Sequence, residues 1–211
     1  MNQKIRINIL MRLQNNNPNP REELNCSSPF EVLISTLLSA QSTDTRVNKA
    51  TCRLYKLANT APQLLKLGLD KLKEHIKTIG LHNTKAKNII NICHILLEKH
   101  GGNVPNTRET LESLPGVGRK TANIVLNTSF NLPTIAVDRH IFRFCNRSNF
   151  AIGKNVREVE NKLLKYVPKK FQIYCHKWFV LHGRYTCLSK KPKCETCLIK
   201  DLCEFKKKII S

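Results

Sequence analysis

Apolar residues recur at the spacing of α-helical turns along almost the whole chain, and this periodicity constrains the fold more than any other feature. One such series runs through Ala86, Ile89, Cys93 and Leu97. Alternating patterns typical of strands are nearly absent. The chain has 211 residues, of which 41% are hydrophobic, enough to form a substantial core. We therefore expect an all-α protein of about ten short helices.

Local signals predict where several helices begin and end. The spacing of a capping box occurs at residues 28–31, 60–63 and 155–158. Glycines that are expected to end helices stand at positions 68, 80 and 101–102. Loop-forming stretches at 17–20 and near 131–133 are the candidate boundaries of two lobes.

The chain is strongly basic, with 36 Lys and Arg against 15 Asp and Glu and a formal net charge of +21. The excess is distributed along the sequence instead of being confined to a tail, which favours a polyanion as partner over a merely basic surface. The first sixteen residues form an amphipathic helix and not a signal-peptide core, and no run is apolar enough to cross a membrane. We therefore expect a cytoplasmic protein whose nine cysteines are thiols or metal ligands.

The segment LPGVGRKTA, residues 114–122, superficially resembles a nucleotide-binding P-loop. A P-loop requires glycine before its lysine and follows a strand, whereas here Arg119 precedes Lys120 and the preceding segment is predicted to be helical. The remaining interpretation is a helix–turn–helix whose glycines expose backbone N–H groups to a phosphate of DNA. An ordinary glycine turn is the alternative. Lys120 either adds charge to this site or, desolvated in a cleft beside Arg119, loses its proton and acts as a nucleophile.

Four cysteines lie within seventeen residues near the C-terminus, with the spacing Cys-x6-Cys-x2-Cys-x5-Cys. This spacing favours a cubane iron–sulfur cluster over zinc without excluding zinc. The other five cysteines are expected in the core. Three lysines between the first two ligands form a basic loop that is either a phosphate contact or simply solvated. The ligands are Cys187, Cys194, Cys197 and Cys203, and the lysines are Lys190, Lys191 and Lys193.

Together with LLSAQSTD (37–44) and TIAVDRHIFR (134–143), the hairpin and the cysteine spacing make the chain similar to the endonuclease III family of bacterial DNA glycosylases, within the helix-hairpin-helix superfamily. The resemblance extends over essentially the full length. It implies a six-helix barrel lobe at 22–132, with the hairpin at about 108–127. It also implies a cluster lobe formed by 1–21 and 133–211, with one [4Fe-4S] cluster on the four cysteines of the 187–203 loop.

The same resemblance implies the role of each candidate residue. Lys120 would be the nucleophile and Asp138 the catalytic carboxylate. Gln41 and Leu81 would enter the DNA stack where the damaged nucleotide leaves it. From residue types alone, Asp138 could cap the next helix, a role compatible with catalysis because the cap would orient the carboxylate. Gln41 could be a helix-end amide and Leu81 a core residue. The remaining expected DNA contacts are Gly116, Val117, Gly118, Arg119, Lys190, Lys191 and Lys193.

The implied activity is base-excision repair. The enzyme would remove oxidised or saturated pyrimidines from duplex DNA and then cleave the strand 3′ of the abasic site by β-elimination through a Schiff base. Its partner would be double-stranded DNA with damaged pyrimidines or abasic sites, and we expect a monomer associated with the nucleoid. The alternatives are a monofunctional glycosylase, an electron-transfer protein, and a non-catalytic helix-hairpin-helix module with a structural metal.

Overall fold

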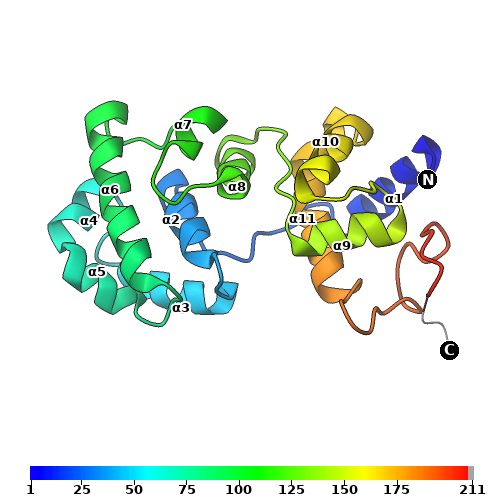
Figure 1. The fold of residues 1–211 in the computed structure, drawn as a ribbon, viewed down its shortest axis with the longest axis horizontal. Coiled ribbons are helices and arrows are strands. Elements are labelled where there is room, and N and C mark those ends of the chain that lie inside the picture. The colour runs from blue at the N-terminus through cyan, green and yellow to red at the C-terminus, as the bar shows by residue number, and fades with distance from the viewer. Residues whose placement is uncertain (209–211) are drawn as a thin grey trace. The chain divides into compact units, whose positions relative to one another are not determined.

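The computed structural model describes residues 1–208, which contain eleven α-helices and no strand (Figure 1). This confirms the all-α expectation. No helix in this part of the chain is long and apolar enough to cross a membrane. The helices are α1 (Gln3–Asn16), α2 (Pro29–Ser39), α3 (Asp44–Leu54), α4 (Ala61–Leu67), α5 (Leu69–Ile76), α6 (His82–His100), α7 (Arg108–Glu112), α8 (Arg119–Phe130), α9 (Arg139–Ser148), α10 (Val156–Tyr166) and α11 (Lys169–Tyr185).

The chain divides into two compact units. The hairpin unit is Glu22–Leu132, and the cysteine unit joins Met1–Arg21 to the chain from Pro133 onward. Helix α2 lies at the centre of the hairpin unit, where it packs against α3, α6 and α8 (Figure 1). It is apolar on nearly every side, and Leu33, Ile34 and Leu38 have no exposed surface. A helix of this kind is stable only when it is buried by its neighbours.

The cysteine unit is built around an aromatic cluster supplied by α9, α11 and the segment after α9. The Phe144 ring centroid lies 4.8 Å from that of Phe179, which in turn lies 5.0 Å from that of Phe150. Helix α1 packs against α11. Arg12 of α1 also donates to both carboxylate oxygens of Asp201, at 2.6 and 2.8 Å. The first helix and the end of the chain therefore belong to one folded unit.

The helix-capping predictions are confirmed at two of the three capping-box positions. Ser28 and Asn155 accept hydrogen bonds from the backbone N–H three residues on, as predicted. Thr60 makes no such bond, although Gln63 Oε1 accepts from the Asn59 backbone N–H. Gly68 and Gly101 end α4 and α6 with positive φ. The prediction for Gly80 is wrong, since α5 already ends at Ile76 and a turn continues past it.

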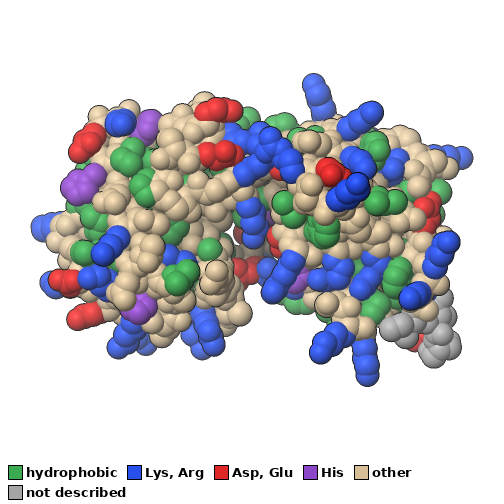
Figure 2. All heavy atoms as spheres, viewed as in Figure 1, with side chains coloured by type: hydrophobic (Ala, Val, Ile, Leu, Met, Phe, Trp, Pro, Cys, Tyr) green, Lys and Arg blue, Asp and Glu red, His purple; other side chains and the backbone are tan. Residues whose placement is uncertain are grey.

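The positive charge is not as evenly distributed as the sequence suggests. The cysteine unit holds 22 Lys and Arg against 6 Asp and Glu, a formal net charge of +16, whereas the hairpin unit holds 14 against 9, or +5. Figure 2 shows the consequence, because Lys and Arg side chains extend over the visible face of the cysteine unit with few acidic groups among them. An anionic partner is therefore attracted most strongly by the cysteine unit.

Candidate functional site

Helices α7 and α8 form a hairpin whose turn is held by hydrogen bonds and by two buried apolar residues. Thr107 caps α7 by accepting from the Thr110 backbone N–H at 3.4 Å. Arg108 Nε donates to Asn123 Oδ1 at 3.0 Å, which joins α7 to α8. Leu114 and Val117 are buried in the core of the hairpin unit. The turn is therefore fixed by packing on one side, while its glycines remain on the surface.

The two glycines of the turn differ in backbone conformation and in the space around them. Gly116 has φ +77°, and a Cβ added there would lie 2.5 Å from Nδ2 of Asn88 on α6. Gly118 has an ordinary φ of −97° and open space around it, and it is the N-cap of α8. No side chain caps this helix. Its first-turn N–H groups and its positive dipole end are therefore directed toward an anion that could occupy the turn.

Lys120 is exposed in the first turn of α8, next to these backbone donors. Arg119 Nη1 lies 3.9 Å from Glu112 Oε1, so the guanidinium and this carboxylate form an ion pair across the hairpin. Glu112 thus helps to orient Arg119. The arrangement places a primary amine beside the N-terminus of α8, which no side chain caps.

Gln41 and Leu81 lie in two turns that meet. Both adopt left-handed backbone conformations, with φ of 58° and 59°, and both side chains are exposed. Leu81 is 61% exposed, so the alternative that it belongs to the core is wrong. A Cβ built on Gly80 would lie 3.6 Å from the Gln41 carbonyl oxygen, which places the two backbones in contact. An amide and an apolar side chain are thereby displayed together on the hairpin unit.

Asp138 is the N-cap of α9 and is half-buried at the end of a buried segment, Ile135–Val137. Its Oδ1 accepts from the backbone N–H groups of His140 and Ile141, both at 2.8 Å. The predicted capping role is confirmed. Because both bonds use Oδ1, the other carboxylate oxygen takes no part in the cap. Lys120 belongs to the hairpin unit and Asp138 to the cysteine unit.

A contact network that the sequence did not reveal holds the start of α9. The His140 carbonyl oxygen packs so closely on Gly183 of α11 that a Cβ there would lie only 2.7 Å away. Arg143 donates to the carbonyls of Gly183 and Cys187, the latter at 2.9 Å. Burial, with smaller contributions from Arg143 and Arg139, lowers the pKa of His140. The network connects the Asp138 turn to the beginning of the cysteine loop.

The four cysteines of the 187–203 loop are free and half-buried. Arg147 Nη1 lies 3.5 Å from Cys187 Sγ and donates to the Leu188 carbonyl at 2.7 Å. Cys197 Sγ lies 3.7 Å from Nε2 of the buried His182. Burial raises the pKa of the Cys197 thiol, and the three other loop thiols raise it further.

The four loop cysteines supply an all-sulfur donor set. Within residues 1–208, no three His, Cys, Asp or Glu side chains are grouped closely enough to hold one metal ion. A cubane iron–sulfur cluster takes four thiolates as ligands, one on each iron. The soft, all-thiol donor set fits this requirement. Lys190, Lys191 and Lys193 are exposed on the same loop.

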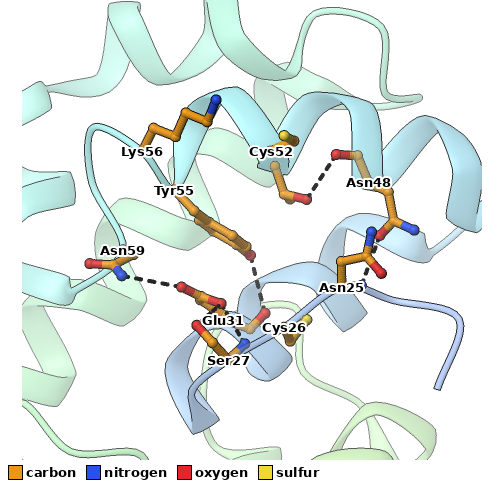
Figure 3. A pocket seen from close by; sticks show the side chains of 10 residues that line it. Asn25, Cys26, Ser27, Glu31, Asn48, Cys52, Tyr55, Lys56 and Asn59 are labelled. Atoms are coloured by element: carbon orange, nitrogen blue, oxygen red, sulfur yellow. Dashed lines mark hydrogen bonds between the residues drawn. The ribbon is translucent and has the colours of Figure 1, made fainter. Parts of the chain in front are cut away.

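The remaining cysteines follow the prediction only in part. Cys93, Cys145 and Cys175 are buried, and the half-buried Cys26 packs against the core of the hairpin unit. Cys52 is exposed, so the core assignment is wrong for this residue. Cys26 and Cys52 both line a cavity of about 580 Å³ in the hairpin unit (Figure 3). Its buried carboxylate, Glu31, accepts from the Ser27 backbone N–H at 2.7 Å and from Asn59 Nδ2 at 3.2 Å. The carboxylate of Glu31 is therefore satisfied by hydrogen bonds from other residues of the cavity.

Comparison with known proteins places these features in a family. Residues 34–169 match the model of the HhH-GPD superfamily base excision DNA repair protein. The chain is 62% identical over 209 residues to endonuclease III of Escherichia coli K12 and 61% identical to that of Haemophilus influenzae, and each match covers 99% of both proteins.

Solved structures agree with the sequence comparison. A non-covalent endonuclease III–DNA complex matches with a TM-score of 0.90 and 39% identity, and a trapped endonuclease III–DNA covalent intermediate matches with a TM-score of 0.89 and 38% identity. Both matches cover 97% of this chain and 96% of the other. The chain therefore belongs to the HhH-GPD superfamily of base excision DNA repair proteins, in the endonuclease III family of DNA glycosylases with apurinic/apyrimidinic lyase activity.

Proposed function

We propose that this enzyme removes oxidised or saturated pyrimidines from duplex DNA and then cleaves the strand on the 3′ side of the abasic site. The observation that carries the proposal is an exposed lysine in the first turn of α8, beside a hairpin with no side-chain cap. The hairpin would hold a DNA phosphate through the backbone of Gly116, Val117 and Gly118, with Arg119 adding charge. Binding of this kind positions the DNA without selecting a base sequence.

The chemistry follows from an amine nucleophile. Lys120 Nζ would attack the sugar carbon that bears the damaged base, forming a carbon–nitrogen bond as the bond to the base breaks and the base leaves with a proton. The amino sugar that results opens when its C1′–O4′ bond breaks and O4′ takes up a proton. This leaves a protonated Schiff base between C1′ and Nζ, which makes the C2′ proton acidic. Loss of that proton expels the 3′ phosphate and breaks the strand. A water nucleophile would release only the base, so the amine distinguishes a lyase from a monofunctional glycosylase.

Asp138 is proposed as the carboxylate that assists the first step. Positive charge develops on the sugar as the base departs, and a fixed negative group stabilises it or accepts the proton of the attacking ammonium. The cap on α9 supports this role because two backbone N–H bonds hold Oδ1 in place. The carboxylate is thereby oriented before the substrate binds.

Gln41 and Leu81 are proposed to fill the space that the flipped nucleotide leaves. Extruding a base costs unstacking and unpairing energy, and a side chain in the gap keeps the duplex from closing again. The joint display of both side chains on adjoining exposed turns supports this role. The amide of Gln41 can bond to the unpaired base, while Leu81 replaces stacking contacts.

One [4Fe-4S] cluster is proposed on Cys187, Cys194, Cys197 and Cys203. When bound, it would supply a covalent centre that holds the loop in one conformation. Arg143 and Arg147 support this assignment because they hold the first part of the loop through its carbonyl oxygens. Lys190, Lys191 and Lys193 would then meet DNA phosphates from a fixed loop. We also propose that the enzyme is a monomer and acts in the cytoplasm on the nucleoid.

Borohydride trapping tests the nucleophile. The natural protein and Lys120→Ala are each incubated with a duplex that contains one oxidised pyrimidine. A covalent protein–DNA adduct is expected for the natural protein and not for the variant. The control is Lys99→Ala, which replaces an exposed lysine in the last turn of α6. This variant should retain the adduct.

The outcomes separate the candidate functions. Base release without an adduct from the natural protein would mean that water is the nucleophile and that the enzyme is a monofunctional glycosylase. An adduct that persists in Lys120→Ala would assign the Schiff base to another amine. Binding with neither release nor adduct would favour a non-catalytic DNA-binding module.

A further inference from the structure

Lys85 is a buried cation on the apolar face of α6. It is 6% exposed and lies at helical spacing from Ile89 and Cys93, which have no exposed surface. Lysine is almost never buried without a partner, because its charge loses hydration. This desolvation lowers the pKa of Lys85. An apolar residue would fill the position at less cost, so the lysine calls for a specific explanation.

The ammonium group of Lys85 binds the end of α2. Its Nζ donates to the Leu38 carbonyl at 2.8 Å and to the Ala40 carbonyl. These are among the last carbonyls of the helix, where the dipole is negative and the backbone acceptors have no partner within the helix. Gln41 follows immediately. The side chain of Lys85 therefore fixes the backbone from which the Gln41 turn departs.

The backbone of Lys85 holds the second turn. Its N–H donates to the Leu81 carbonyl at 3.0 Å, which starts α6 directly after the left-handed Leu81. A left-handed conformation is unfavourable for leucine and for glutamine, and such residues persist only when their surroundings hold them. One residue thus contacts both strained turns, whose backbones also meet at Gly80 and Gln41.

We propose that Lys85 is a positioning residue that holds the Gln41 and Leu81 turns in one rigid arrangement, ready to enter the DNA stack as the damaged nucleotide leaves. The inference rests on the proposed roles of Gln41 and Leu81. Its consequence is selective: Lys85 is important where a base pair must be opened and less important where the lesion has no partner. A misplaced side chain far from the reacting atoms can slow a reaction by about a hundredfold.

The test compares two duplexes with the same saturated pyrimidine, one opposite a purine and one opposite a stable abasic analogue. Single-turnover base excision is measured for the natural protein, Lys85→Met and Lys85→Arg. Lys85→Met is expected to lose at least about tenfold on the paired lesion and much less on the unpaired lesion, because flipping an unpaired base costs least. Lys85→Arg, which keeps a buried cationic donor, should recover most of the loss. Lys99→Met is the matched control on α6 and should behave as the natural protein.

A double-mutant comparison then separates positioning from general support of the fold. If Lys85 acts through the two turns, Lys85→Met should add little to a Gln41→Ala/Leu81→Ala variant, because groups in one network are not additive. An equal loss on both duplexes, or a full additional loss in that background, would overturn the inference. Should Lys85→Met fail to fold, Lys85→Gln, which keeps a neutral donor, is measured under the same two criteria. Natural protein that excises neither lesion would instead refute the proposed function.

Discussion

At the residue scale, Asp138 caps α9 and is also the proposed catalytic carboxylate. Two substitutions can separate these roles. Its Oδ1 caps α9 through two 2.8 Å hydrogen bonds. Asp138→Ala should lower the free energy of unfolding by about 1 kcal/mol, whereas Asp138→Asn keeps a capping oxygen and should change it by only a few tenths. Both variants should slow excision by roughly a hundredfold, because neither carries the charge. Urea unfolding and single-turnover excision measure the two effects, and a fully active Asp138→Asn would remove the charge from the mechanism.

The hairpin glycines provide a second residue-scale comparison. Gly116→Ala should destabilise the hairpin by about 1 kcal/mol or more, because its φ is positive and the new Cβ would collide with the Asn88 amide. Gly118→Ala meets neither obstacle and should cost about 1 kcal/mol or less, as the loss of a glycine N-cap. Urea unfolding gives the stabilities. DNA affinity should fall for Gly116→Ala on damaged and undamaged duplexes alike. A lesion-specific loss would mean that this turn does more than hold the backbone.

At the scale of elements, side-chain hydrogen bonds hold the cysteine loop near its beginning and near its end. Arg143 and Arg147 bind the carbonyls of Cys187, Leu188 and Ser189. Arg12 binds the Leu198 carbonyl and the Asp201 carboxylate, and the buried apolar residues of the loop are Pro192 and Ile199. Cys197→Ala should therefore yield protein without iron in which trypsin cleaves at the loop lysines while helical circular dichroism is retained. DNA affinity should fall as well. Cys52→Ala, which changes an exposed cysteine outside the loop, is the control, and unchanged DNA affinity in Cys197→Ala would refute the loop's structural role.

Elements were predictable from sequence where their determinants are local. Helical periodicity and the caps at Ser28 and Asn155 depend on residues within one turn, and the structure confirms them. The capping-box spacing at Thr60 is the exception, because Thr60 makes no side-chain cap and nothing in the structure explains the difference. The role of Lys85 could not be predicted either, because its carbonyl partners lie in α2, more than forty residues earlier. A cation on an apolar helical face was the only local sign.

At the scale of the whole molecule, the sequence indicated the total charge but not how that charge is divided between the two units. The excess appeared continuous along the chain, yet the two units carry +16 and +5 because the cysteine unit draws on both ends of the sequence. The two proposed catalytic residues also belong to different units, with Lys120 in the hairpin unit and Asp138 in the cysteine unit. No local pattern connects two such residues. Only the family resemblance assigned them to one reaction.

The salt dependence of DNA binding tests how this charge is used. Neutralising roughly six phosphates predicts a slope of about −5 for the logarithm of affinity against the logarithm of salt concentration, since each contact contributes about −0.9. Replacing the three loop lysines (Lys190, Lys191 and Lys193) by alanine should bring the slope to about −3 if each contacts one phosphate. Fluorescence anisotropy with an abasic-analogue duplex at several salt concentrations gives both values.

The matched control removes the same charge from the hairpin unit. Lys56, Lys66 and Lys71 are exposed, and their replacement by alanine also lowers the net charge from +21 by three. If the loop lysines contact phosphates directly, this control should keep a slope of about −5, because charges beyond about 8 Å are largely screened at physiological salt. Equal losses in the two triple variants would mean that the loop contributes only to the overall field. The cysteine loop would then have no contact with the DNA backbone, and the positive charge of the cysteine unit would attract DNA without positioning it.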